Sequence, residues 1–110
     1  MKLRIEDNTI RLRVSPEEVV TFQQTGRLET TVPLGPAVSD RFIYALQRDE
    51  TATDSVPSIS YTSGRIVVRL PALVADSWSS SEEIGIRGTM EVTENQVVDI
   101  LIEKDLPCKH

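Results

Sequence analysis

Four cations alternate with aliphatic residues near the start of the chain: Lys2, Arg4, Arg11 and Arg13. Alternation with a period of two is typical of a β-strand that has one buried and one solvated face. Asp7-Asn8, between the two alternating runs, has the residue types of a two-residue hairpin turn. This turn would place Arg4 opposite Arg11 and Lys2 opposite Arg13 on the solvated face of the hairpin.

Like charges directly opposite each other destabilise a sheet, so this predicted face needs a counter-anion. Two further arginines occupy the matching outward positions of a later predicted hairpin. The anion could be a phosphate, a nucleic-acid backbone or an acidic partner, since the forked guanidinium suits each of them. The candidate anion- or partner-binding residues are therefore Lys2, Arg4, Arg11, Arg13, Arg65 and Arg69.

The alternative, which we favour, is that the chain neutralises these cations itself. A turn at residues 94–96 would place Arg87 opposite Glu103 and Glu91 opposite Asp99 on the outer side of the last hairpin. If this more acidic hairpin lay beside the cationic one, it would supply the missing negative charge.

Residues suited to catalysis or metal binding are few. The only cysteine and the only histidine are Cys108 and His110, close to Asp105. These are three types of metal ligand, but a zinc site needs four well-placed ligands. Ser77, Ser79, Ser80 and Ser81 form a polar cluster that indicates a helix end and loop rather than a nucleophile. We therefore expect no catalytic residues, no metal and no cofactor.

The length and composition of the chain limit the class of protein to which it can belong. The 110 residues suffice for one domain, 1–110, and the net charge of −5 makes the chain acidic. This charge disfavours nucleic acid as a partner without excluding a local basic patch. No run of apolar residues is long enough for a membrane helix or a secretory signal, so we expect a cytoplasmic protein without a membrane partner.

Helix and strand signals alternate along the chain. Ser15-Pro16-Glu17-Glu18 combines an N-cap, a proline at the first helical position and a capping box, which predicts a helix over 16–25. Strands are expected on both sides of it, and residues 47–57 are interpreted as a polar connector. Pro71 is expected to open a second short helix that ends near Trp78.

The second half of the chain repeats the order of the first. A shift of 56 positions superposes Ile10 on Ile66 and Phe22 on Trp78, which suggests half-repeats 1–46 and 58–105, each hairpin-helix-hairpin. The similarity of alternating strands to one another is an alternative explanation. Either way, the predicted fold is β-rich α+β, with about eight short, mostly antiparallel strands and two short helices.

The sequence also resembles two known groups of proteins. The opening residues 2–13, the helix start at 15–19 and the ending 103–108 resemble an uncharacterised family of small single-domain bacterial proteins. This resemblance implies a bacterial protein but no activity. Residues 63–71 and the helix after them are similar in topology to the swapped-hairpin barrels of AbrB-type regulators, which bind DNA through arginines.

These observations lead to two functional hypotheses. The first is a non-enzymatic, acidic binding or structural module whose partner is another, unidentified protein. The second is a swapped-hairpin DNA-binding regulator or antitoxin-like protein that uses the arginines of its sheet face on phosphates. An enzyme or metal protein centred on Cys108 is a more remote third possibility.

Overall fold

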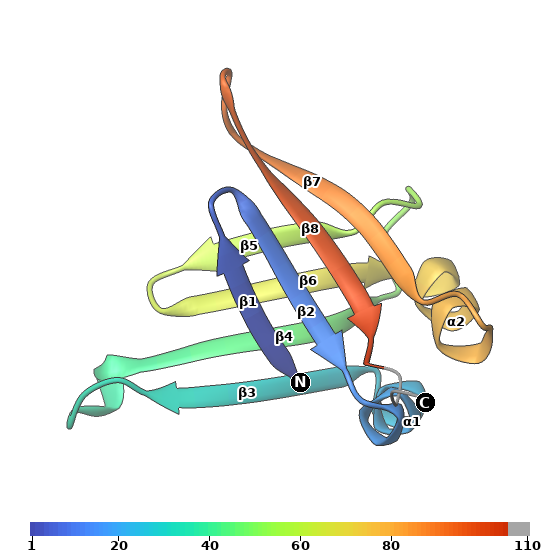
Figure 1. Cartoon of the computed structure of the whole chain (residues 1–110), viewed down its shortest axis with the longest axis horizontal. Coiled ribbons are helices and arrows are strands. Elements are labelled where there is room, and N and C mark those ends of the chain that lie inside the picture. The colour runs from blue at the N-terminus through green and yellow to red at the C-terminus, as the bar shows by residue number, and fades with distance from the viewer. Residues whose placement is uncertain (106–110) are drawn as a thin grey trace, which may run out of the picture.

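The computed structural model describes residues 1–105, which form eight strands, two α-helices and one 3₁₀ turn (Figure 1). The first hairpin consists of β1 (Lys2–Glu6) and β2 (Thr9–Val14). Its register is the predicted one, with Arg4 opposite Arg11 and Lys2 opposite Arg13. Asp7 in the turn has a φ of 50°, which an aspartate tolerates better than most residues.

Helix α1 (Pro16–Thr25) follows directly and confirms the predicted helix and its capping box. The Glu18 backbone N–H donates to Ser15 Oγ at 3.2 Å, and the Ser15 backbone N–H donates to Glu18 Oε1 at 3.0 Å. Gly26 ends the helix with a φ of 75°, a left-handed conformation that costs glycine little. These local bonds fix the path of the chain from β2 into the next strand.

The second hairpin consists of β3 (Arg27–Pro33) and β4 (Arg41–Asp49), joined through the 3₁₀ turn Val38–Asp40. Strand β4 is longer than predicted, and the connector therefore begins at Glu50 rather than at residue 47. The extension forms because Gln47 and its two successors pair with β6 on the neighbouring side.

The second half contains β5 (Ser58–Thr62), β6 (Arg65–Pro71), α2 (Ala72–Ser80), β7 (Gly85–Thr93) and β8 (Gln96–Lys104). Helix α2 begins one residue after Pro71, which occupies the N-cap position, and it continues two residues past Trp78. No helix in residues 1–105 is long and apolar enough to cross a membrane.

The predicted register of the last hairpin is wrong. Glu103 lies opposite Gly85 rather than Arg87, and Asp99 lies opposite Thr89 rather than Glu91. The turn is shorter than the three residues assumed, and an irregularity between Glu91 and Thr93 shifts the pairing. Because a β-bulge adds a residue to one strand only, alternation alone does not reveal it.

Each sheet combines one hairpin from each half of the chain. Sheet A has the strand order β1-β2-β8-β7, and sheet B has the order β3-β4-β6-β5. Pairs within hairpins are antiparallel, whereas β2–β8 and β4–β6 are parallel, so pairing is mostly antiparallel as predicted. The sheets stack with their strands crossing, and both helices lie near the same end of the molecule (Figure 1).

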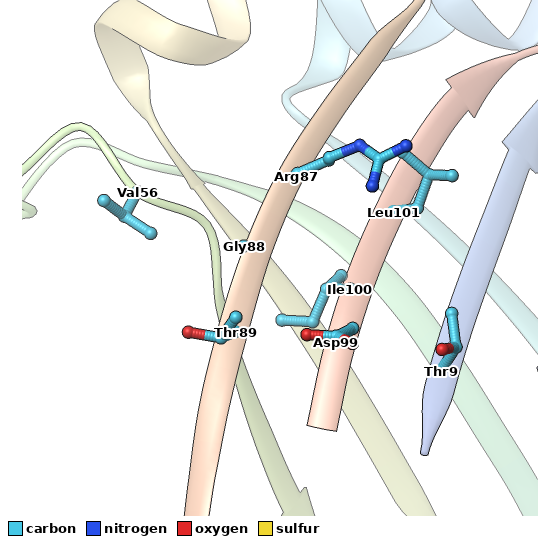
Figure 2. A pocket seen from close by; sticks show the side chains of 8 residues that line it. All are labelled: Thr9, Val56, Arg87, Gly88, Thr89, Asp99, Ile100 and Leu101. Atoms are coloured by element: carbon cyan, nitrogen blue, oxygen red, sulfur yellow. The ribbon is translucent and has the colours of Figure 1, made fainter. Parts of the chain in front are cut away.

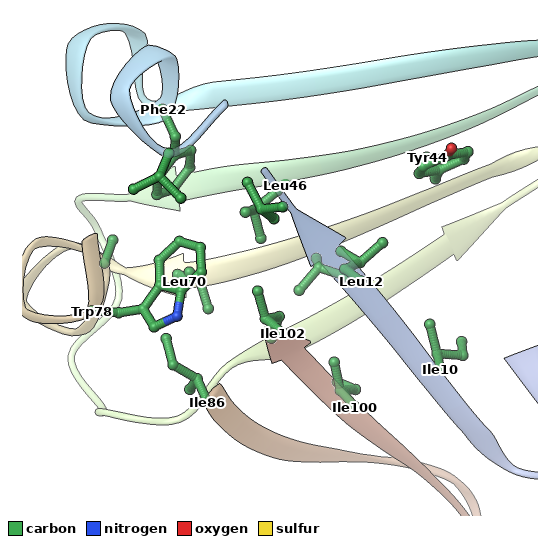
Figure 3. Packing of buried hydrophobic residues seen from close by; sticks show 14 of the residues in the cluster. Ile10, Leu12, Phe22, Tyr44, Leu46, Leu70, Trp78, Ile86, Ile100 and Ile102 are labelled. Atoms are coloured by element: carbon green, nitrogen blue, oxygen red, sulfur yellow. The ribbon is translucent and has the colours of Figure 1, made fainter. Parts of the chain in front are cut away.

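The core lies between the inner faces of the two sheets and is closed at one end by the helices (Figure 3). Phe22 of α1 and Trp78 of α2 meet edge to face, with ring centroids 6.1 Å apart. Both side chains are fully buried. Alternation places Ile5 on the inner face of β1, but it is 58% exposed because it lies near the turn end of an edge strand.

The first three elements of the two halves begin at positions 56 residues apart. A shift of 56 positions maps the bounds of β1 onto those of β5 and the first residues of β2 and α1 onto those of β6 and α2. Buried Ile10 corresponds to buried Ile66, and Phe22 corresponds to Trp78. The elements therefore follow in the same order in both halves, and each half contributes one hairpin to each sheet.

Candidate anion-binding face

Lys2, Arg4, Arg11 and Arg13 lie on the outer face of sheet A, the face turned away from sheet B. We call this group the cationic face. Strand alternation positions them, because the intervening residues of β2 point inward and are buried. The register confirms that the four side chains share one flank of the first hairpin.

Glu103 of β8 supplies the main neutralising charge of this face. Its Oε1 accepts hydrogen bonds from Arg11 Nε at 3.2 Å and from Arg11 Nη2 at 2.7 Å. Arg13 Nε lies 3.8 Å from the same oxygen. Parallel pairing of β2 with β8 places Glu103 directly beside Arg13. The chain therefore provides part of its own counter-charge, as the favoured interpretation of the sequence expected, although through a different pairing.

The other two cations have only peripheral partners. Lys2 Nζ lies 3.7 Å from Asp105 Oδ2, and Arg4 Nη2 lies 3.1 Å from Glu6 Oε2. The Lys2 and Arg4 side chains are 78% and 65% exposed. Exposed pairs of this kind contribute about 0–1 kcal/mol and rearrange easily. An anion from outside could therefore replace either carboxylate at little cost.

The cationic face surrounds a shallow hollow of about 250 Å³, lined by the four cations and Leu3. The hollow lies along the first hairpin at the edge of sheet A. Four cations around one hollow are suited to receiving carboxylate or phosphate oxygens.

Arg65 and Arg69 lie elsewhere, on the outer face of sheet B. Arg65 Nη1 donates to Glu29 Oε1 at 3.2 Å, and Arg69 Nη1 donates to Ser60 Oγ at 2.7 Å. Hydrogen bonding from Arg27, together with that from Arg65, lowers the pKa of Glu29. The six candidate residues therefore form two separate groups, because the hairpins that carry them belong to different sheets.

A second hollow on sheet A has no counterpart among the sites predicted from the sequence. It has a volume of about 440 Å³ and is bordered by Thr9, Arg87, Thr89 and Asp99, with Val56 of the connector beyond β7. Figure 2 shows the Arg87 guanidinium close to Leu101 of β8. Arg87 makes no ion pair with any residue in 1–105. The predicted register paired Arg87 with Glu103, so nothing in the sequence indicated that Arg87 would border a hollow without that carboxylate as its partner.

Two of the groups that could do chemistry have structural partners. Glu18 caps α1, and Ser80 Oγ donates to the Asp76 carbonyl at 2.5 Å near the end of α2. Within residues 1–105, no three His, Cys, Asp or Glu side chains gather into a possible metal site. Cys108 and His110 lie outside the described residues, and the hypothesis about them stays untested.

Comparisons with known proteins identify the family and leave the activity open. Searches of curated proteins and of solved structures found no match. The likeness to AbrB-type barrels therefore stays a prediction. A family model described as "Family of unknown function (DUF7009)" matches residues 1–110, in line with the predicted resemblance to an uncharacterised family of small single-domain proteins. The match spans the whole sequence, and the chain therefore belongs to this family.

Proposed function

We propose that this domain is a non-enzymatic binding module that engages an acidic segment of a partner protein through the cationic face. The observation that carries the proposal is the hollow surrounded by Lys2, Arg4, Arg11 and Arg13. Arg11 is occupied by Glu103, but the side chains of Lys2, Arg4 and Arg13 are all more than half exposed. Carboxylates of a partner could bridge these three cations.

An acidic protein segment suits this face better than a nucleic acid does. Glu6, Asp99 and Glu103 lie on the same outer face as the cations. A nucleic-acid backbone carries closely spaced negative charge and would be repelled by these carboxylates, and by the net charge of −5. A protein segment can place single carboxylates beside the cations and leave the acidic positions uncovered.

The proposal includes a bacterial, cytoplasmic setting. The resemblance to small bacterial proteins favours the first part. The single cysteine favours a reducing compartment, because a chain with one cysteine gains no internal disulfide from oxidation.

The test measures binding of a glutamate-rich peptide and, separately, of a random-sequence DNA duplex by fluorescence anisotropy at low and physiological salt. We expect the peptide to bind and the duplex to bind more weakly. The triple variant Lys2→Gln/Arg4→Gln/Arg13→Gln should weaken peptide binding about tenfold or more, since it removes both the charge that steers the acidic peptide to this face and the charge-assisted hydrogen bonds that hold it there.

The matched control is the triple variant Arg27→Gln/Arg65→Gln/Arg69→Gln, which removes the same charge from the outer face of sheet B. It should retain the wild-type affinity for the peptide. Equal loss in both variants would indicate a nonspecific charge effect and refute the assignment of the face. Tighter binding of the duplex, with a steep dependence on salt, would favour the DNA-binding alternative.

A further inference from the structure

Helix α2 exposes a large apolar residue where helix chemistry favours an acidic one. Leu73 is the second residue of α2 and is 85% exposed. The N-terminal turn of a helix carries partial positive charge, which favours acidic side chains there. The repeat provides an internal comparison, because the corresponding position of α1 is Glu17. Neither helix formation nor packing within the described chain therefore explains Leu73.

Leu73 borders a hollow between α2 and β7 with a volume of about 440 Å³. Val74 of α2 and Ser55 of the connector line the same hollow. Two apolar residues next in sequence to its lining, Val56 and Ile84, are each 48% exposed. Exposed apolar side chains are therefore present on the connector and just before β7 as well as on α2.

The charges lining this hollow are self-complementary. Glu83 and Arg87 both border it. Neither side chain forms an ion pair within residues 1–105. In a contact with two-fold symmetry, a residue i that meets residue j of the partner implies that j also meets i. Glu83 of each copy could thus pair with Arg87 of the other, on either side of a central contact between Leu73 side chains.

We infer that the surface between α2 and β7 is a homodimer interface, occupied by a second copy of this chain. An acid and a base that have no ion-pair partner among residues 1–105 lie beside an exposed leucine, and they provide the complementarity that such an isologous contact needs. The inference does not rest on the proposed function, because β7 and β1 are opposite edges of sheet A. The cationic face on β1 and β2 would stay accessible in the dimer.

The first test is sedimentation velocity of the full chain over a wide range of concentrations. The wild type should dimerise, and Leu73→Glu should raise the dimer dissociation constant about 100-fold or more, since the leucine is lost from both copies. The substitution places a Glu17-like residue in α2, so the monomer should keep its circular-dichroism spectrum. The control Val20→Asp, which places an Asp76-like residue in α1, should change the constant less than about twofold.

The second test reverses the charges. Glu83→Arg and Arg87→Glu should each weaken the dimer roughly tenfold, because each places like charges together twice. The double variant Glu83→Arg/Arg87→Glu should restore wild-type dimerisation, which loss of folding could not do. A wild-type chain that stays monomeric at every concentration would overturn the inference, and the surface between α2 and β7 would then bind a different protein, if any. Dimerisation that survives Leu73→Glu, or that the double reversal fails to restore, would also refute it.

Discussion

At the scale of single residues, Glu103 is the carboxylate that pairs with both Arg11 and Arg13 at the candidate site. Its Oε1 is the acceptor for two Arg11 nitrogens and is the carboxylate oxygen nearest to Arg13 Nε. The Glu103 side chain is 20% exposed, so water replaces these contacts poorly. Without this carboxylate, the guanidinium groups of Arg11 and Arg13 on β2 would repel each other with no anion between them.

We therefore expect Glu103→Gln to destabilise the fold by about 1–2 kcal/mol, because it removes a charge-assisted hydrogen bond that is partly buried. The measurement is urea denaturation followed by circular dichroism. The control Glu6→Gln removes a carboxylate from an exposed pair and should change stability by less than about 0.5 kcal/mol. Equal effects of the two substitutions would show that Glu103 has no special role.

A second residue-scale prediction concerns Glu18. Partial burial alone would raise its pKa, but hydrogen bonds from the Met1 amino group and the Ser15 backbone N–H outweigh burial and lower the pKa from its ordinary 4.5. A carboxyl whose pKa falls on folding stabilises the fold above its unfolded pKa, and this contribution is lost as pH falls through the folded value.

The stability difference between wild type and Glu18→Gln should thus be constant near neutral pH and shrink as pH falls below about 4.5. Denaturation midpoints measured across the acid range check this. A difference that stays unchanged down to the lowest pH would contradict the role given to the Glu18 carboxylate.

At the scale of elements, β7 is positioned by a close approach to the connector. A Cβ added at Gly88 would lie 2.9 Å from the Pro57 carbonyl oxygen, a backbone atom that has little freedom to move. The same addition at Gly85 would meet nothing nearer than a flexible Leu101 methyl at 3.4 Å. The two glycines lie on one strand, so they form a matched pair.

Gly88→Ala should therefore cost about 1–3 kcal/mol through the backbone clash, whereas Gly85→Ala should cost less than about 1 kcal/mol. Thermal or urea unfolding of both variants tests this. The result would be contradicted if Gly85→Ala were the more damaging change.

At the scale of the whole molecule, the exchange of hairpins makes each half dependent on the other. Every sheet contains a parallel pair between the halves, β2 with β8 or β4 with β6. Phe22 and Trp78 likewise meet across the division. Neither half alone could bury its inner faces, because the strands beside them come from the other half.

We expect peptides 1–54 and 55–110 to be unfolded separately and to assemble when mixed, since the cut lies in the connector. Far-ultraviolet circular dichroism of each peptide and of their mixture tests this expectation. A cooperative thermal transition in either peptide alone would show that the halves are independent units.

The local elements could be predicted because their signals are short-range. The capping box at Ser15, the first hairpin with its facing arginines and the similar order of elements in the two halves all follow from residue types at fixed spacing. The division of the fold into hairpin, helix and hairpin was therefore predictable, and so was the alignment of four cations on one flank.

What only the tertiary structure decided is which hairpin lies beside which. Parallel pairing of β2 with β8 brings Glu103 to Arg11, and it separates Arg65 and Arg69 onto the other sheet. The bulge near Glu91 moved Arg87 away from its predicted partner. Pairing between distant strands depends on the packing of both sheets around a shared core, and alternation within one strand carries no information about that neighbour.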